Sequence, residues 1–211
     1  MKVGMICECA PGGPDVKIGE HFVKEFIPGA EFVGVTMTNK ANLIRDCGRE
    51  VRRLLERERC DVVFIVWDLA PAWPDMKAER CRSRDKEGVR SSLKAAYGGG
   101  AQPADKLVLV CVEQMLESWV VADNNAVVEH VRRPTHKPPR FTAIKHPDRE
   151  KDPKSRLISY FQQAGRAYNE HVDAVPILKQ ASHSMLRRSE SFKRFAEKLS
   201  ERALGTGPKR R

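Results

Sequence analysis

The sequence predicts an α/β fold, in which a mostly parallel sheet is covered by helices and followed by a C-terminal helical extension. Two observations support this class. Short apolar runs alternate with amphipathic segments along the first 131 residues. In addition, the run 61–67 is β-branched and apolar on both faces, as in the middle of a parallel sheet. A chain of 211 residues that is 41% hydrophobic is long enough to bury a core.

The first half of the chain alternates strands and helices. We expect strands at 2–8 and 32–37, since both are short apolar runs bounded by turn residues. We expect helices at 16–26 and 42–59, because apolar side chains recur there at helical spacing. This order favours strands that run parallel, with helices as crossovers.

The middle of the chain continues the alternation. After the strand 61–67, a loop over 68–75 leads into a charged helix that ends near Tyr97. A second central strand is expected at 106–112, followed by one helix from about 114 to 131. Within that helix we expect Trp119 to pack in the core.

The C-terminal third has a different character. We divide the chain into an α/β domain (1–132), a basic proline-rich linker (133–153), a helical segment (154–204) and a basic tail (205–211). The helical segment is predicted to hold helices near 155–169, 174–186 and 189–204.

The net charge of +10 favours an anionic partner such as DNA or RNA, although a solvated basic surface would give the same count. Much of the excess lies near the linker, and the residues expected to contact phosphates are Arg132, Arg133, Lys137, Arg140, Lys145 and Lys154. For Lys154, simple solvation is the alternative. No apolar run approaches the ~20 residues of a membrane span, so we expect a cytoplasmic protein.

Cysteine and histidine do not indicate a catalytic or zinc site. No CxxC pair occurs among the six cysteines, and the six histidines are scattered. A glycine-rich stretch at 10–15 lacks the lysine and serine or threonine of a phosphate-binding loop, which disfavours a nucleotide-binding domain.

Three predicted strands end at an acid or directly before one: the acids are Glu8, Asp68 and Glu113. Because the carboxyl ends of parallel strands form the ligand-binding edge of such a sheet, we expect these side chains to converge. Three converging carboxylates repel one another unless a divalent cation neutralises them, and Mg²⁺ or Mn²⁺ suits oxygen ligands. Each acid alone could instead be solvated or cap a helix.

Other acids could assist this site. Glu117 lies four residues after Glu113, and would serve either the metal or the dipole of the helix that follows. Helper roles are open for Asp15, Asp75 and Asp123. For Asp15 and Asp75, capping of the next helix is the alternative, and it is preferred for Asp75.

The pattern VxVExxLExWxxAD at 110–123 resembles the signature of the bacterial domain-of-unknown-function family numbered four-two-seven-six. Further similarity lies in Glu8, in Asp68, in DPKxxL at 152–157 and in SFKRFAEKL at 191–199. That family is Toprim-like and related to overcoming-lysogenisation-defect nucleases and the RloB group. The resemblance implies a Toprim- or Rossmann-like sheet, and a role in phage or mobile-element defence.

The resemblance also implies roles for the acids. Glu8 would be the acid of the first strand, and Asp68 would open the metal-binding aspartate motif. The second carboxylate of an Asp-x-Asp pair is absent, because Leu69 and Ala70 follow Asp68. Glu113 or Glu117 could supply the missing ligand.

Two functions follow from these expectations. The first is metal-dependent phosphodiester hydrolysis of nucleic acid, with Glu8, Asp68 and Glu113 as the catalytic acids. The second is a catalytically degenerate binding or regulatory subunit of a partner ATPase, which the missing aspartate favours. Either function is compatible with a homo-oligomer.

Overall fold

The computed structural model describes residues 1–70, 72, 79–132 and 140–205. Contacts divide the chain into two compact units. Unit 1 comprises Met1–Cys111 together with Arg194–Arg211, and unit 2 comprises Val112–Lys193. No helix in the described residues is both long enough and apolar enough to cross a membrane.

Unit 1 is built on a four-stranded parallel sheet, which confirms the predicted α/β class. The strands β1 (Lys2–Cys7), β2 (Glu31–Thr36), β3 (Val62–Asp68) and β4 (Leu107–Val112) are arranged in the order β2-β1-β3-β4. At the end of β1, Cys7 is aligned with Thr36 of β2 and with Val66 of β3. The residues that follow β1 and β3 therefore emerge at the same edge.

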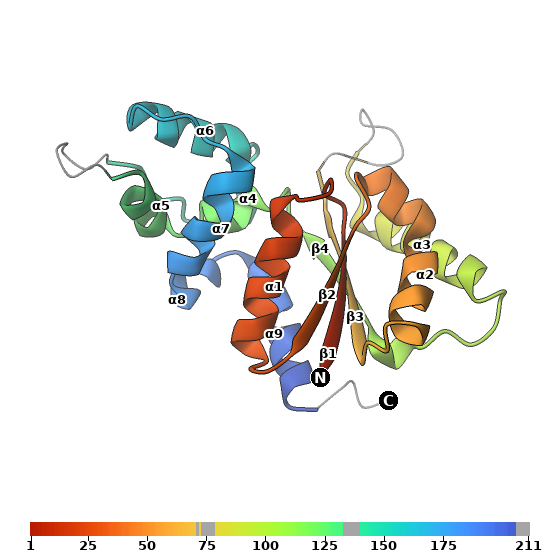
Figure 1. Ribbon diagram of the computed structural model, residues 1–211. Helices are drawn as coiled ribbons and strands as arrows, with labels where there is room; N and C mark the ends of the chain where they lie inside the picture. The colour runs from red at the N-terminus through yellow and green to blue at the C-terminus, as the bar shows by residue number, and fades with distance from the viewer. Residues whose placement is uncertain (71, 73–78, 133–139, 206–211) are drawn as a thin grey trace. The chain divides into compact units, whose positions relative to one another are not determined.

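Helices cover both faces of this sheet. One face packs against α1 (Pro14–Phe26) and the other against α2 (Lys40–Glu56) and α3 (Arg82–Ala96), as Figure 1 shows. The C-terminal helix α9 (Glu190–Ala203) reaches the α1 face through Phe195, whose ring is edge-on to Phe22 and Phe64 at centroid distances of 6.3 and 6.2 Å. A short 3-10 turn, Ala104–Lys106, leads into β4.

The core follows the alternation of side chains along the strands. Every second side chain along the strands faces α2 and α3, where it packs against the apolar faces of both helices. This cluster includes Ile6, Leu43, Ile44, Cys47, Val51, Val63, Ile65, Trp67, Val89 and Leu93. Its members are buried, and they include Cys47, Cys60 and Cys111, as expected for small apolar side chains.

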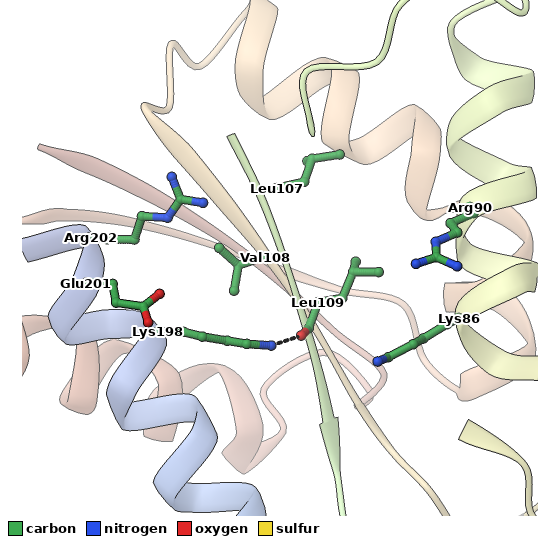
Figure 2. A pocket seen from close by; sticks show the side chains of 8 residues that line it. All are labelled: Lys86, Arg90, Leu107, Val108, Leu109, Lys198, Glu201 and Arg202. Atoms are coloured by element: carbon green, nitrogen blue, oxygen red, sulfur yellow. Dashed lines mark hydrogen bonds between the residues drawn. The ribbon is translucent and has the colours of Figure 1, made fainter. Parts of the chain in front are cut away.

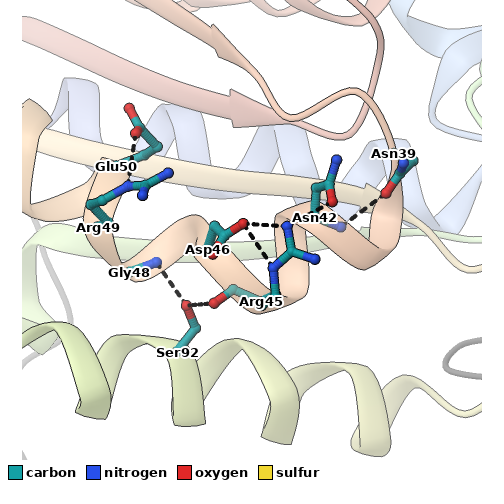
Figure 3. Close-up of polar contacts among 8 residues, drawn as sticks. All are labelled: Asn39, Asn42, Arg45, Asp46, Gly48, Arg49, Glu50 and Ser92. Atoms are coloured by element: carbon teal, nitrogen blue, oxygen red, sulfur yellow. Dashed lines mark hydrogen bonds and ion pairs between the residues drawn. The ribbon is translucent and has the colours of Figure 1, made fainter.

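The helices α2 and α3 approach closely at Gly48. A Cβ atom on Gly48 would lie 2.2 Å from the carbonyl oxygen of Ser92, so only glycine fits there. The Ser92 hydroxyl accepts a hydrogen bond from the Gly48 N–H (3.0 Å) and donates one to the Arg45 carbonyl (2.8 Å), as seen in Figure 3. This contact fixes the two helices together on one face of the sheet.

Unit 2 is helical and contains α4 (Glu117–Val120), α5 (Asn124–Val131), α6 (Pro153–Gln163), α7 (Glu170–Gln180) and α8 (His183–Leu186), with a 3-10 turn at Pro147–Arg149. The prediction of one helix over 114–131 is wrong. Asp123 interrupts it by accepting hydrogen bonds from the N–H groups of Asn125 (3.0 Å) and Ala126 (3.3 Å), which starts α5 as a new helix.

The later helices follow the predicted order, but their ends differ from the predicted ones. The segment expected to be helical over 155–169 stops at Gln163, and α7 begins only after Asn169, whose side chain caps it. The segment expected over 174–186 is divided in two, because Ser182 adopts an extended conformation before α8. The predicted helix 189–204 corresponds to α9.

Candidate functional site

Two of the three strand-end acids come together in unit 1. Asp68 is the last residue of β3, and Glu8 directly follows β1, the neighbouring strand. The backbone N–H of Asp68 donates a hydrogen bond to the Glu8 carboxylate. The parallel register therefore places both acids at the carboxyl edge of the sheet, where parallel α/β proteins bind ligands.

The Glu8 carboxyl group is in an unusual environment. Its Oε2 atom is buried and has no hydrogen-bond partner in the described part of the chain. Burial raises the pKa of Glu8 to about 8, an effect that Lys40 opposes and Asp15 reinforces. A carboxyl group in this state needs a proton or a cation to be stable when buried.

A buried ion pair lies next to Glu8. The ammonium group of Lys40, in the first turn of α2, is 2.8 Å from Oδ2 of Asp85 and 3.1 Å from the carbonyl oxygen of Leu69. The indole Nε1 of Trp67 donates to the same Asp85 oxygen at 3.2 Å. Lys40 is 5% exposed and Asp85 1%, so this pair is a fixed part of the edge.

The sequence patterns do not predict a role for Lys40 or Asp85 in this site. The position of Asp85 can be recognised in the sequence. Asp85, Val89 and Leu93 are spaced four residues apart and lie on the same buried face of α3. An acid on an apolar stripe needs a partner. Like Glu8, Asp85 keeps one buried carboxylate oxygen, Oδ1, for which the described residues provide no hydrogen-bond partner.

Asp15 and the two neighbouring cysteines complete this edge. Asp15 lies in the first turn of α1, and its carboxylate hydrogen-bonds with the thiol of Cys9. Burial, followed by the charge of Asp15, raises the pKa of Cys9 to about 12. Burial also raises the pKa of Cys7, and the charges of Asp15, Glu8 and Asp68 add to the effect. Both thiols are therefore protonated and unsuited to act as nucleophiles.

The donor set of this edge fits Mg²⁺ in chemistry. Mg²⁺ is commonly held by one or two carboxylates, with water and substrate phosphate completing its coordination. The Oε2 atom of Glu8 is buried without a hydrogen-bond partner among the described residues, and the Glu8 carboxylate accepts a hydrogen bond from the backbone N–H of Asp68. Within the described ranges, no three His, Cys, Asp or Glu side chains are grouped so that they could hold a metal ion on their own.

Glu113 and Glu117 belong to unit 2. Glu113 precedes α4, and its carbonyl oxygen accepts a hydrogen bond from the Ser118 hydroxyl at 3.1 Å. Gln114 follows with a φ of 62°, so Glu113 and Glu117 do not lie on one helix face. Glu117 starts α4, is buried, and lies 3.9 Å from the ammonium group of Lys154.

Lys154 forms a second ion pair, with Glu170 of α7. The lysine therefore bridges two acids within unit 2. Among the other basic residues expected to bind phosphates, Arg132 pairs with Glu129, with 3.4 Å between Nη1 and Oε2. Arg140 and Lys145 are exposed. Arg133 and Lys137 lie outside the described residues, as does Asp75.

The most distinctive part of the 110–123 motif contributes to the core of unit 2. Trp119 is 1% exposed, its Nε1 donates to the Ser191 hydroxyl at 2.9 Å, and its ring is edge-on to Phe192. This confirms the prediction of a core tryptophan. Asp123 accepts from the Ser182 N–H at 2.8 Å in addition to capping α5, so its carboxylate is engaged by backbone groups.

Comparison with known proteins adds no relative. The chain matches no protein-family model, no curated protein and no solved structure.

Proposed function

We propose that the carboxyl edge of unit 1 is a divalent-metal site for phosphodiester hydrolysis of nucleic acid, with Glu8 and Asp68 as ligands. The observation that carries this proposal is the buried Oε2 atom of Glu8, which has no hydrogen-bond partner among the described residues and adjoins Asp68. Burying a carboxylate without compensation is costly, and a divalent cation would compensate it.

Each residue of the edge has a distinct part in this proposal. Glu8 and Asp68 hold Mg²⁺ or Mn²⁺, which would lower the pKa of a bound water and neutralise charge on the leaving oxygen. Lys40 and Asp85 are positioning residues, because their ion pair fixes the start of α2 against Leu69, directly after Asp68. The protein's excess of positive charge would attract the phosphate backbone.

Cleavage of a fluorescently labelled oligonucleotide in Mg²⁺ or Mn²⁺ tests this function. The protein should cut DNA or RNA only with the metal, and Glu8→Gln and Asp68→Asn should each reduce the rate at least a hundredfold. Glu197→Gln, which removes an exposed acid of α9, is the matched control and should retain the wild-type rate. Activity that survives both edge substitutions contradicts the proposal.

A second function is supported by Lys40. Its ammonium group already neutralises part of the acidic edge, as expected if the site has lost its metal and the protein acts as a binding or regulatory subunit, for instance of an ATPase. In that case, Mg²⁺ and Mn²⁺ should leave the melting temperature of the protein unchanged. A metal-dependent rise that requires Glu8 would eliminate this second candidate.

A further inference from the structure

A basic groove runs beside the edge strand β4 in unit 1. It encloses a cavity of about 280 Å³ and has Leu107, Val108 and Leu109 as its floor. Figure 2 shows α3 on one side and α9 on the other. The charged lining residues are Lys86, Arg90, Lys198, Glu201 and Arg202. Four of these five side chains are cationic, so the groove carries a local positive excess.

The cations on the two walls are held differently. On α9, Lys198 donates to the carbonyl oxygen of Leu109, and Arg202 Nη1 donates to that of Asp105 at 2.6 Å. These bonds fix both side chains in the groove without cancelling their charges. On α3, Lys86 and Arg90 make no ion pair or hydrogen bond with the rest of the described chain.

The assembled charge is unfavourable without a counter-ion. Burial lowers the pKa of Lys198, the charges of Lys86 and Arg194 lower it further, and the charge of Glu201 opposes this shift. Each wall presents its pair of cations at a spacing of four residues, about one helical turn apart. An anion between the walls would relieve this repulsion, and arginine and lysine both bind phosphate oxygens well.

We propose that the groove lined by Lys86, Arg90, Lys198 and Arg202 binds the phosphate groups of a nucleic-acid strand. The groove follows the first half of β4, whereas Glu8 and Asp68 lie where β1 and β3 end, so this is a separate binding site rather than part of the reaction edge. The choice of nucleic acid as the polyanion rests on the proposed function. The expectation that the groove binds phosphate groups does not depend on the proposed function.

Fluorescence anisotropy with a labelled 12-nucleotide single-stranded DNA, measured in EDTA, tests the groove without any metal chemistry. The variant Lys86→Gln/Arg90→Gln removes the two cations that have no internal partner among the described residues. The control Lys17→Gln/Lys94→Gln removes two exposed lysines of α1 and α3 outside the groove. Circular dichroism melting should show that both variants remain folded.

The groove variant should bind about tenfold more weakly at 0.1 M salt. The slope of log K against log salt concentration should fall by about 1.4, as expected for two lost phosphate contacts on a single strand. In the control variant, both the affinity and the salt slope should change by less than they do in the groove variant. Inorganic pyrophosphate should compete for the wild-type groove, which distinguishes a phosphate site from a surface that attracts any long polyanion.

Three results would overturn the proposal: unchanged binding by the groove variant, equal losses in both variants, or equal affinity for polyglutamate of the same charge. Because the measurement excludes divalent cations, it is independent of hydrolysis. Loss of binding in the groove variant would support the groove even if no cleavage were found. Metal-dependent cleavage with unchanged groove binding would reject the groove alone.

Discussion

Glu8 is the residue on which the chemistry of unit 1 depends. It follows a central strand, its side chain is half-buried, and its buried Oε2 atom lacks a hydrogen-bond partner in the described part of the chain. Its position after an apolar strand was evident in the sequence. Its surroundings were not, because they combine Asp15, Lys40 and Asp85, which are distant from one another in the sequence.

The raised pKa of Glu8 predicts how stability depends on pH. With a pKa of about 8 in the folded state against an ordinary value of 4.5, the folded protein holds a proton that the unfolded chain releases between these two pH values. The free energy of unfolding should therefore fall as the pH rises from 5 to 8 in the absence of metal.

Substitution of Glu8 by Gln should remove this dependence. The free energy of unfolding of Glu8→Gln should exceed that of wild type by on the order of 3 kcal/mol at pH 9. At pH 5 the two proteins should be similarly stable. Urea denaturation in EDTA at both pH values measures the difference. A variant that is less stable than wild type at pH 9 would show that the buried carboxylate is well compensated by Lys40.

The ion pair of Lys40 and Asp85 gives a second prediction. Lys40→Met should destabilise the protein by about 3–5 kcal/mol, because it leaves Asp85 buried without a cation. The double variant Lys40→Met/Asp85→Leu should recover at least half of this loss, since no charge is then left unpaired. Urea midpoints at pH 7 measure both, and a loss that persists in the double variant would contradict this explanation.

At the scale of elements, the strands were the most predictable part of the chain. All four were expected within about two residues of their observed ends, because short apolar runs between turns have few alternative structures. The break between α4 and α5 was missed, because Asp123 was considered for a role in the metal site rather than for the cap that ends one helix and starts the next.

The close approach of α2 and α3 predicts the effect of Gly48→Ala. Alanine normally favours a helix over glycine by about 1 kcal/mol, but here its Cβ would lie 2.2 Å from the Ser92 carbonyl oxygen. The net effect should be a loss of about 1–3 kcal/mol. Arg49→Ala, at the next and exposed position, should change stability by less than about 0.5 kcal/mol in the same urea titration.

At the scale of the whole molecule, charge was predictable in amount but not in location. The sequence drew attention to the basic stretch around the linker, whereas the groove of unit 1 combines cations from α3 and α9, which are about a hundred residues apart. Lys40 and Asp85 are likewise distant in the chain. Such sites arise only through tertiary packing, and each of their residues resembles an ordinary solvated charge in the sequence.

We propose that a divalent cation binds at Glu8 and Asp68. The most direct test is the change in melting temperature on adding Mg²⁺ or Mn²⁺ at pH 6 and pH 9, for wild type, Glu8→Gln and Glu197→Gln. At a free metal concentration ten times the Kd at pH 9, used at both pH values, wild type should gain about 4 °C at pH 9, and the control Glu197→Gln should match it.

The gain should be larger at pH 9 than at pH 6, because the proton that competes at Glu8 is lost near pH 8. Glu8→Gln should show no gain at either pH. If wild type shows no metal-dependent rise at pH 9, or if Glu8→Gln shows the same rise as wild type, the carboxyl edge of the sheet is not a metal site.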